Sequence, residues 1–546
     1  MSALTDLLPP VGSDPSLVLD AFAEWATAGG RPLYSHQEEA ALALAAGEHV
    51  VLATPTGSGK SLVAIAGVLL ALNDRRRAVW TAPIKALVAE KFFDLVDLLG
   101  AQQVGLATGD ASINSDAPVL VCTAEVLANN ALARGAASDF GFACLDEFHY
   151  YADPDRGWAW QVPLLELTNC QMLLASATLG DMSAITTDLH QRSGRSVSEV
   201  TSVDRPTPLY HQWRMTSVPD SVLDAVRDGL SPVYVVHANQ AAAIERAQGL
   251  VSTNVTTRAQ REAIATAMAG VKMGRGFGET LDRLIRNGVG VHHAGMLPRY
   301  RRLVERLAGE GLLPVICGTD TLGVGVNIPI RTVLMTALTK FDGSRVRQFS
   351  VREFHQLAGR AGRPGFDPDG HVWVQAPDHV IENTRALAKA GDDPKARRKA
   401  GKAKVPEGFV NYDEAAMHRI IAARPEPLVS RFRVTADLVA GVLGRPDGPS
   451  ALKHLLRTNH DAPAKRRQHK KRAIAVYRSL EAAGVAERVR DASGRCQGVR
   501  VGSLVEGTDE RAALRFSAPL TPLAIEVIAT FDRDDPAYLL DVVSVI

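Results

Sequence analysis

The sequence has little cysteine, almost no net charge and no long apolar run. No uninterrupted apolar stretch is long enough to span a bilayer, and no basic segment followed by an apolar stretch marks an export signal. An odd number of scattered cysteines without metal-ligand spacing argues against a disulfide framework and against a zinc site. We therefore expect a cytoplasmic protein without a membrane segment, whose thiols are buried and reduced: Cys122, Cys144, Cys170, Cys317 and Cys496.

The small net charge also limits how the chain binds nucleic acid. Its formal value is +1, so any affinity for phosphates must come from local patches and not from a global field. With 46% hydrophobic and 22% charged residues, the composition is that of an ordinary soluble globular protein. A length of 546 residues predicts several domains.

Short apolar runs alternate with amphipathic stretches over most of the chain. The first series contains EHVVLATP, RRAVWTAPI, APVLVCT, FGFACLDE and CQMLLASAT, and the second contains SPVYVVHA, GVGVHHAG, LLPVICGT, RTVLMTA and GHVWVQA. Such βαβ alternation predicts parallel sheets that bind ligands at the carboxyl ends of their strands. We expect an N-terminal segment at 1–29 and two tandem α/β domains at 30–205 and 206–385.

The composition changes after the second domain. A basic linker is expected at 386–414, around KARRKAGKAK (395–404), which is either a solvated loop or a binding site. Residues 415–505 are mostly helical with a late strand pair, the pattern of a winged-helix domain, and contain a second basic run, KRRQHKKR (465–472). Residues 506–546 end in YLLDVVSVI without a capping residue, so we expect the truncated start of a helical domain.

The segment TPTGSGKS (54–61) follows a strand and opens a helix. Gly57 and Gly59 let the backbone N–H groups point at phosphate oxygens, Lys60 neutralises the β- and γ-phosphates, and the Ser61 hydroxyl is a magnesium ligand. Thr54 stands where the common pattern has glycine. The predicted nucleotide-binding loop is Thr54, Pro55, Thr56, Gly57, Ser58, Gly59, Lys60 and Ser61.

Two adjacent carboxylates, Asp146 and Glu147, end the run FGFACLDE. Adjacent carboxylates repel each other, and a charged turn that closes a strand is one explanation. In a domain with a phosphate loop, however, a cation relieves the repulsion and hydrolysis needs a positioned water. We therefore expect Asp146 to bind magnesium through water and Glu147 to orient the attacking water.

The segment FHQLAGRAGRPG (354–365) places Gln356, Arg360 and Arg363 on a predicted helix that faces the first domain. Arginines three residues apart share a helix face and stabilise charge that develops on a γ-phosphate. An arginine pair on the surface of a glycine-rich turn is the structural alternative. This segment separates the chain from kinases and nucleotide switches, which share the first two motifs.

These motifs, in this order, resemble the superfamily-two DExH-box helicases, within the superkiller-like branch that includes the exosome-associated RNA helicases. The resemblance rests on YSHQEEA, TPTGSGKS, TAPIKALVAEK, TGD, TAEVL, DEFH, SAT, VHHAGMLPRYR, GTDTLGVGVNIP and HQLAGRAGR, and it extends from about residue 30 over nearly the whole chain. The sequence is most similar to actinobacterial DEAD/DEAH-box proteins that end in a domain of unknown function. The resemblance implies two RecA-like domains, a winged-helix domain and the start of a helical domain, with ATP and Mg²⁺ as cofactors.

The resemblance also implies roles for single residues. Gln37 would read adenine, Gly325 and Asn327 would approach the nucleotide, and Arg360 and Arg363 would be arginine fingers. Ser176 and Thr178 would link the ATP site to the bound strand. His149 would sense closure of the cleft, with a hydrogen-bonded core histidine as the alternative. The implied contacts to the nucleic-acid backbone are Pro83, Lys85, Thr108, Gly109, Thr123, His293, Thr319 and Thr321.

The segment ALTKFDGSRVRQFS (337–350) alternates around Asp-Gly and therefore predicts a β-hairpin. In the superkiller-like branch a hairpin at this place splits the duplex. An ordinary hairpin at a sheet edge is the alternative.

The resemblance implies a monomeric motor that moves 3′ to 5′ along a single strand or a tailed duplex. RNA is favoured over DNA because the segment EPLVSRFRVTADLVAGVL (426–443) resembles the RNA-processing members, whereas archaeal DNA-repair helicases share the KFDG and GRAGRPG neighbourhoods. A DNA helicase of the same superfamily remains open, as does an ATP-dependent clamp or remodeller that does not unwind.

Overall fold

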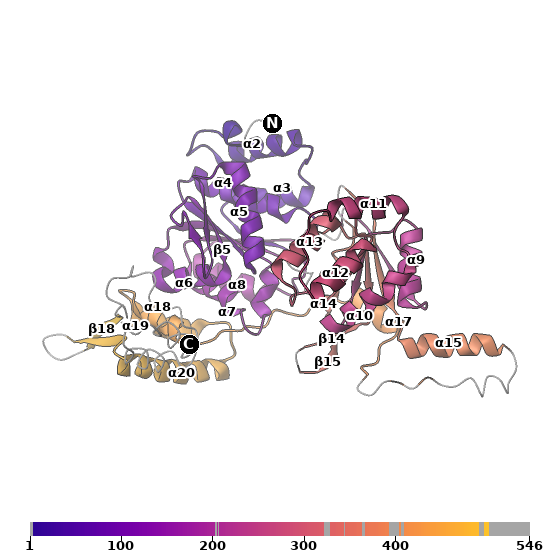
Figure 1. Cartoon of the computed structure of the whole chain (residues 1–546). Coiled ribbons are helices and arrows are strands. Elements are labelled where there is room, and N and C mark those ends of the chain that lie inside the picture. The colour runs from indigo at the N-terminus through magenta and orange to yellow at the C-terminus, as the bar shows by residue number, and fades with distance from the viewer. Residues whose placement is uncertain are drawn as a thin grey trace, which may run out of the picture.

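The computed structural model describes residues 4–201, 205, 207–320, 328–342, 344–362, 366–391, 403, 405, 409–490 and 496–501. Two separate sheets, each surrounded by helices, form its centre, and three further helices with a strand pair lie beneath the first sheet domain (Figure 1). The α/β fold class predicted from the sequence, with two parallel-sheet, RecA-like domains, is therefore confirmed.

The first sheet has eight strands in the order β4-β3-β5-β2-β6-β7-β1-β8. All neighbouring strands pair in parallel except β3 and β4. In the centre, β7 pairs with β1, which precedes the phosphate loop, and with β6, which leads to the carboxylate pair. The strands are β1 (His49–Leu52), β2 (Arg77–Ala82), β3 (Val104–Ala107), β4 (Ser112–Ile113), β5 (Val119–Thr123), β6 (Phe140–Asp146), β7 (Gln171–Ala175) and β8 (Val197–Val200).

Helices cover both faces of this sheet, which is why its strands are continuous apolar runs. Side chains that alternate along a strand enter two different cores: Val50 and Leu52 pack with the N-terminal helices, and Val51 packs with the helices that follow β5. The first face carries α1 (Leu4–Leu7), α2 (Pro15–Ala28), α3 (Ser35–Ala45), α4 (Lys60–Asn73) and α5 (Lys85–Leu99). The second face carries α6 (Ala124–Arg134), α7 (Trp158–Glu166) and α8 (Ser183–Ser193), with the short 3-10 helices η1 (Gly135–Ala137) and η2 (Phe148–Ala152).

The second sheet is entirely parallel, with strand order β11-β12-β10-β13-β16-β9. Its strands are β9 (Leu209–Arg214), β10 (Val233–Val236), β11 (Val289–His292), β12 (Val315–Gly318), β13 (Thr332–Met335) and β16 (Gly370–Gln375). The surrounding helices are α9 (Val218–Arg227), α10 (Gln240–Leu250), η3 (Val251–Thr253), α11 (Arg258–Ala267), α12 (Phe277–Arg286), α13 (Pro298–Gly309), α14 (Val351–Ala358) and α15 (Asp378–Ala390). A single core joins them.

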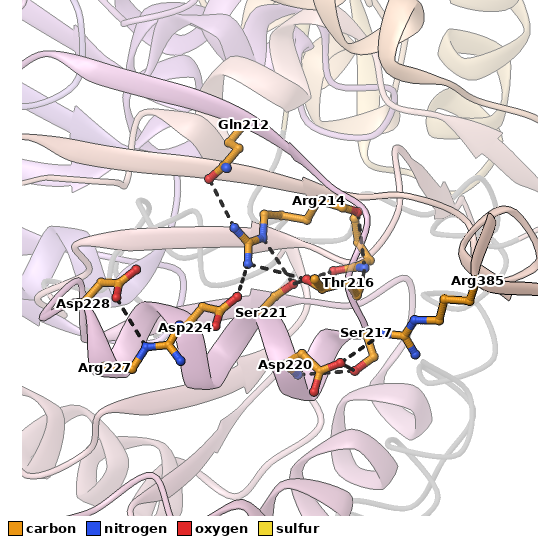
Figure 2. A network of polar contacts seen from close by, with 11 residues as sticks. Gln212, Arg214, Thr216, Ser217, Asp220, Ser221, Asp224, Arg227, Asp228 and Arg385 are labelled. Atoms are coloured by element: carbon orange, nitrogen blue, oxygen red, sulfur yellow. Dashed lines mark hydrogen bonds and ion pairs between the residues drawn. The ribbon is translucent and has the colours of Figure 1, made fainter. Parts of the chain in front are cut away.

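A polar network holds the edge strand β9 in place (Figure 2). The Arg214 guanidinium pairs with Asp224 of α9 and lies 4.4 Å above the Trp373 ring of β16. Ser217 caps α9, and Asp220 in the first turn of α9 pairs with Arg385 of α15 at 3.1 Å. These contacts add to the pairing of β9 with β16 and to the packing of Leu209 and Trp213 on the core.

The predicted hairpin is confirmed. β14 (Thr339–Phe341) and β15 (Val346–Gln348) pair antiparallel, outside the second sheet. Its turn is held by Asp342, whose carboxylate accepts hydrogen bonds from the backbone of Ser344 (3.0 Å) and Arg345 (2.9 Å). The hairpin ends directly before α14, so it belongs to the same segment as the arginine motif.

The C-terminal part begins with α17 (Glu414–Ala422), which packs on the core of the second domain through Met417. The chain then returns to the first domain, where α18 (Ala436–Leu443), α19 (Gly448–Thr458) and α20 (Pro463–Ala482) precede the antiparallel pair β17 (Ala486–Arg490) and β18 (Cys496–Val501) (Figure 1). Three helices and a strand pair are the elements of a winged helix. They share one core with α6 and α7.

The predicted domain limits stay predictions, but several elements cross them. Helices α1 and α2 contribute to the core of the first domain, α15 extends beyond residue 385, and α17 belongs to the second core. Most of the basic segment 395–404, and all of 506–546, lie outside the described residues.

Four cysteines lie within the cores: Cys122, Cys144, Cys170 and Cys317. Burial raises the pKa of each of these thiols, so they stay protonated at neutral pH. Among the described residues, no helix combines the length and the apolar character that crossing a membrane requires.

Candidate ATP site and nucleic-acid interface

The phosphate loop connects β1 to α4 at the carboxyl edge of the first sheet. Gly57 and Gly59 have φ angles of +84° and +77°, in the left-handed region that favours glycine. Lys60 is the first residue of α4, and its Nζ donates to the carbonyl oxygens of Thr54 and Pro55, each at 3.0 Å. The loop and the N-terminus of α4 together have the backbone conformation that suits an anion, and phosphate binding at this loop stays a prediction.

Gln37 supports this loop from the first turn of α3. Its side chain is 1% exposed, and Nε2 donates to the carbonyl oxygens of Ser58 (2.9 Å) and Gly59 (3.1 Å). Oε1 accepts a hydrogen bond from the backbone N–H of Tyr34 at 2.8 Å. Both ends of the amide are therefore engaged within the protein, and the role of Gln37 in reading adenine stays a prediction.

Asp146 ends β6, and Glu147 follows it with a φ of +49°, a conformation that residues other than glycine rarely adopt. Burial and the charge of Glu147 raise the pKa of Asp146. Burial also acts to raise the pKa of Glu147, but the hydrogen bond from His149 and the charges of Lys60 and Arg360 outweigh it and lower this pKa. Glu147 is thus ionised at neutral pH, and Asp146 is a carboxylate that a cation would stabilise.

A chain of hydrogen bonds leads from Glu147 to the second domain. Nδ1 of His149 lies 3.2 Å from Oε2 of Glu147 and 3.0 Å from Oγ of Ser176, which follows β7. The N–H of Thr178 donates to Oγ of Ser176 at 3.3 Å, and Nε2 of Gln356 in α14 donates to Oγ1 of Thr178 at 3.4 Å. His149 is hydrogen-bonded, as expected if it is a core histidine, and its partners Glu147 and Ser176 are residues with predicted roles at the site.

Arg360 brings a positive charge from the second domain to the phosphate loop. The helix α14 ends at Ala358, so Gln356 lies on the helix but Arg360 lies after it; the prediction that Arg360 is on the helix was wrong. The charge of Arg360 acts on both Lys60 and Glu147. Its Nε is buried and has no hydrogen-bond partner among the described residues. Burial lowers the pKa of Arg360, but an arginine stays charged at neutral pH. An unpartnered donor of this kind suits a ligand anion.

Gly359 brings the two domains into close approach. A Cβ at this position would lie only 2.9 Å from Oγ1 of Thr56 in the phosphate loop. The Arg205 guanidinium donates to the carbonyl oxygens of Gly359 (3.0 Å), Ala361 (2.7 Å) and Gly362 (3.1 Å) and thereby holds the loop that carries Arg360. Burial lowers the pKa of Arg205 to about 10.

Arg205 was not predicted from the sequence. It stands alone in the connector DRPTPL between the two domains, where no motif or spacing marks it. The four predicted site residues Thr321, Gly325, Asn327 and Arg363 lie outside the described residues, so their roles stay predictions.

The predicted nucleic-acid contacts of the first domain follow three adjacent strands. Pro83 and Lys85 come after β2, Thr108 and Gly109 after β3, and Thr123 ends β5. In the sheet order these strands form one half of the domain, whereas the strands that carry the phosphate loop, the carboxylates and Ser176 form the other half. Both groups of residues therefore lie at the carboxyl edge of one sheet, in its two halves, and the nucleic-acid contacts stay predictions.

Two of these positions are joined by Asp110. Nζ of the exposed Lys85 pairs with Oδ2 of Asp110 at 2.8 Å, and Oγ1 of Thr108 donates to Oδ1 of Asp110 at 2.8 Å. In the second domain His293 and Thr319 follow the adjacent strands β11 and β12, each 5% exposed. Burial and the neighbouring His292 lower the pKa of His293, so this ring is neutral.

The residues at the phosphate loop fit magnesium. Ser61, the second residue of α4, offers a hydroxyl, and Asp146 offers a carboxylate whose ionised form is disfavoured by burial. Magnesium prefers oxygen ligands and commonly uses one or two protein groups together with phosphates and water. The chemistry of the two donors therefore agrees with the prediction.

Three family models match the chain. Residues 34–185 match "DEAD/DEAH box helicase" and residues 266–365 match "Helicase conserved C-terminal domain". Residues 376–546 match "Domain of unknown function (DUF3516)". The two helicase models cover the phosphate loop, the carboxylate pair and the segment with Arg360, and thus define the class of the two sheet domains.

Among curated proteins, the chain is 28% identical over 506 residues to mouse Superkiller complex protein 2, which covers 80% of this chain and 38% of that protein. It is 30% identical over 412 residues to the probable helicase HelY of Mycobacterium leprae, in a match that covers 62% of this chain and 44% of that protein. It is also 30% identical over 398 residues to the ATP-dependent RNA helicase mtr4 of Schizosaccharomyces pombe, in a match that covers 60% of this chain and 35% of that protein.

The family models and these relatives agree with the site. Together they support a superfamily-two DExH-box helicase of the superkiller-like branch that carries a C-terminal domain of unknown function. The matches span less than half the length of these curated relatives.

Proposed function

We propose that the chain is an ATP-dependent nucleic-acid helicase or translocase that hydrolyses ATP between its two sheet domains. The observation that carries this proposal is the close approach of Gly359, the neighbour of Arg360, to Thr56 of the phosphate loop, because it joins groups from both domains at one site. The charge of Arg360 also acts on Lys60 and Glu147. Such a site is complete only when the domains are together, so nucleotide binding and domain position are coupled.

In this mechanism Lys60 binds the β- and γ-phosphates. Ser61 and Asp146 would hold magnesium, which would neutralise charge on the phosphates. Glu147, ionised and fixed by His149, orients the attacking water and accepts its proton. Arg360, together with Arg363, stabilises the charge that develops on the γ-phosphate. The remaining contacts to the nucleotide come from the loop itself and from Gln37, Gly325 and Asn327.

The hydrogen-bond chain from Glu147 through Ser176 and Thr178 to Gln356 provides a path by which hydrolysis changes the fit of the two domains. Because both domains also grip phosphates at their sheet edges, a change in their fit shifts the strand. We propose movement 3′ to 5′ on RNA, with the hairpin β14–β15 separating the duplex. Two relatives named RNA helicases support the choice of RNA.

The ATPase test uses the whole chain with matched short single strands of RNA and DNA at several salt concentrations. Hydrolysis should rise with added strand. Glu147→Gln should bind ATP with little turnover, since a positioned base contributes about 10²–10⁴ in rate, and Lys60→Ala should weaken ATP binding. Glu39→Gln, on the exposed side of α3, is the matched control and should behave as wild type. Near-normal turnover in Glu147→Gln would overturn the assignment of the base.

The substrate test compares one duplex core with a 3′ or a 5′ tail of RNA or DNA. Unwinding of the 3′-tailed RNA duplex, faster than the others, is expected. Equal unwinding from 5′ tails contradicts the polarity, and faster turnover with DNA tails favours a DNA helicase. Strand-stimulated ATP hydrolysis without strand displacement on any duplex identifies a clamp or remodeller.

A further inference from the structure

The segment 424–435 between α17 and α18 passes between the two sheet domains, and we call it the strap. On its first-domain side, Nε of Arg431 donates to the carbonyl oxygen of Ala152 at 3.1 Å. A Cβ at Gly180 would lie 2.6 Å from the strap's backbone oxygen at Glu426, so the two segments touch. The strap thus contacts the turn after the carboxylate pair and the segment after β7.

On its second-domain side the strap caps α14, the helix that leads to Arg360. The Glu426 carboxylate accepts hydrogen bonds from the backbone N–H groups of Val351 (2.7 Å) and Arg352 (3.2 Å). The next N–H of the helix is satisfied by the capping box of Ser350 and Glu353. A carboxylate at a helix N-terminus is favoured both by the free N–H groups and by the helix dipole.

Arg352 ties this cap to the first domain. Its Nε donates to the carbonyl oxygen of Thr178 at 3.0 Å, and its guanidinium also donates to the backbone oxygen of Glu426. Thr178 is the same residue whose hydroxyl accepts the hydrogen bond from Gln356. Three segments that are far apart in sequence therefore meet around Arg352 and the half-buried Glu426.

We propose that Glu426 is a positioning residue of the ATPase, which fixes α14 so that Gln356 and Arg360 meet the first domain. This inference rests on the proposed function. The helix has only eight residues, so a change of angle at its capped end displaces its other end, next to Arg360. Glu426 does not touch the nucleotide, and it acts only through the helix that it caps.

The main variant is Glu426→Gln, which keeps the shape but loses the charge and can no longer satisfy both N–H groups with carboxylate oxygens. We expect kcat for ATP to fall about 10- to 100-fold, because small displacements of a catalytic group have effects of this size. KM for ATP should change little, since the phosphate loop is intact. Glu426→Asp should retain more activity than Glu426→Gln. Glu414→Gln, exposed in the first turn of α17, is the matched control.

A readout besides turnover keeps the inference testable in every case. Hydrogen exchange of the amides at 351–352 should be faster in Glu426→Gln than in wild type, and the ATP-dependent protection of 354–360 should disappear. If wild type does not hydrolyse ATP, the proposed function fails, while exchange still tests the cap. Unchanged exchange overturns the inference. A lower Tm with unchanged kcat well below that temperature also overturns it, because it shows a merely structural cap.

Discussion

Arg445, directly after α18, should lock the winged helix onto the first domain. Its Nη1 lies 2.6 Å from Oε2 of Glu166 in α7, and the two side chains are only 5% and 7% exposed. Its other nitrogens donate to the carbonyl oxygens of Ala131 and Leu132 at the end of α6. Arg445→Ala leaves the buried Glu166 without its counter-charge, which typically costs about 3–5 kcal/mol.

A chain of several domains does not unfold in a single step, so the cost is best measured as local opening. We expect native-state hydrogen exchange in α18 to become about a hundredfold faster or more in Arg445→Ala. Replacing both partners by apolar residues, as in Arg445→Met with Glu166→Leu, should restore much of the protection, because no charge is left buried. Arg488→Ala, which removes an exposed ion pair with Glu481 in the same domain, should change little. Equally fast exchange in the single and the double variant would refute the reasoning.

Three further variants test other parts of the structure. Gly359→Ala places a Cβ 2.9 Å from the Thr56 hydroxyl, and overpacking of about 1–3 kcal/mol should lower kcat roughly 5- to 100-fold, whereas Gly309→Ala, in open space, should not. Burial raises the pKa of Asp437 to about 7, so between pH about 4 and about 7 the folded state holds a proton that the unfolded state releases. The stability of the folded state should therefore fall as the pH rises from about 4 to about 7. Asp437→Asn should raise Tm at pH about 8 but not at pH about 4. Four exposed basic residues of α20 should bind phosphates: Arg467, Lys470, Lys471 and Arg472. Neutralising any one of them should reduce the slope of log affinity for RNA against log salt concentration by about 0.7, whereas an unchanged slope indicates a solvated face.

Much of the fold could be predicted because the strands that carry the site are buried on both faces. A continuous apolar run such as EHVVLATP can be recognised as a strand without knowing which strands pair with it, and it forms β1 (His49–Leu52), which the phosphate loop follows in the chain. The loop itself was predictable because its left-handed positions are glycines. The hairpin followed from the alternation around Asp-Gly, because turn chemistry is local.

The edge strands could not be predicted in the same way. The strand β8 reads VSEV and β9 reads LYHQWR, and neither is a continuous apolar run. Each pairs with a strand far along the chain, β8 with β1 and β9 with β16, where the Trp373 ring lies beneath Arg214. A short, mixed segment has no signal of its own when its partners are tertiary contacts.

The residues that join the domains show the same limit at the site. Catalysis needs fixed residue types at fixed spacings, and therefore Lys60, Glu147 and Arg360 stand in motifs that the sequence displays. A helix cap needs only an oxygen within reach of free N–H groups, and many segments can supply one. Glu426 lies 75 residues from the N–H of Val351 that it binds, in a connector without periodicity. Arg205 lies 154 residues from the carbonyl of Gly359. The chemistry of this site is thus encoded locally, whereas the alignment of its two halves depends on connector residues that only the folded chain brings to the motif helix.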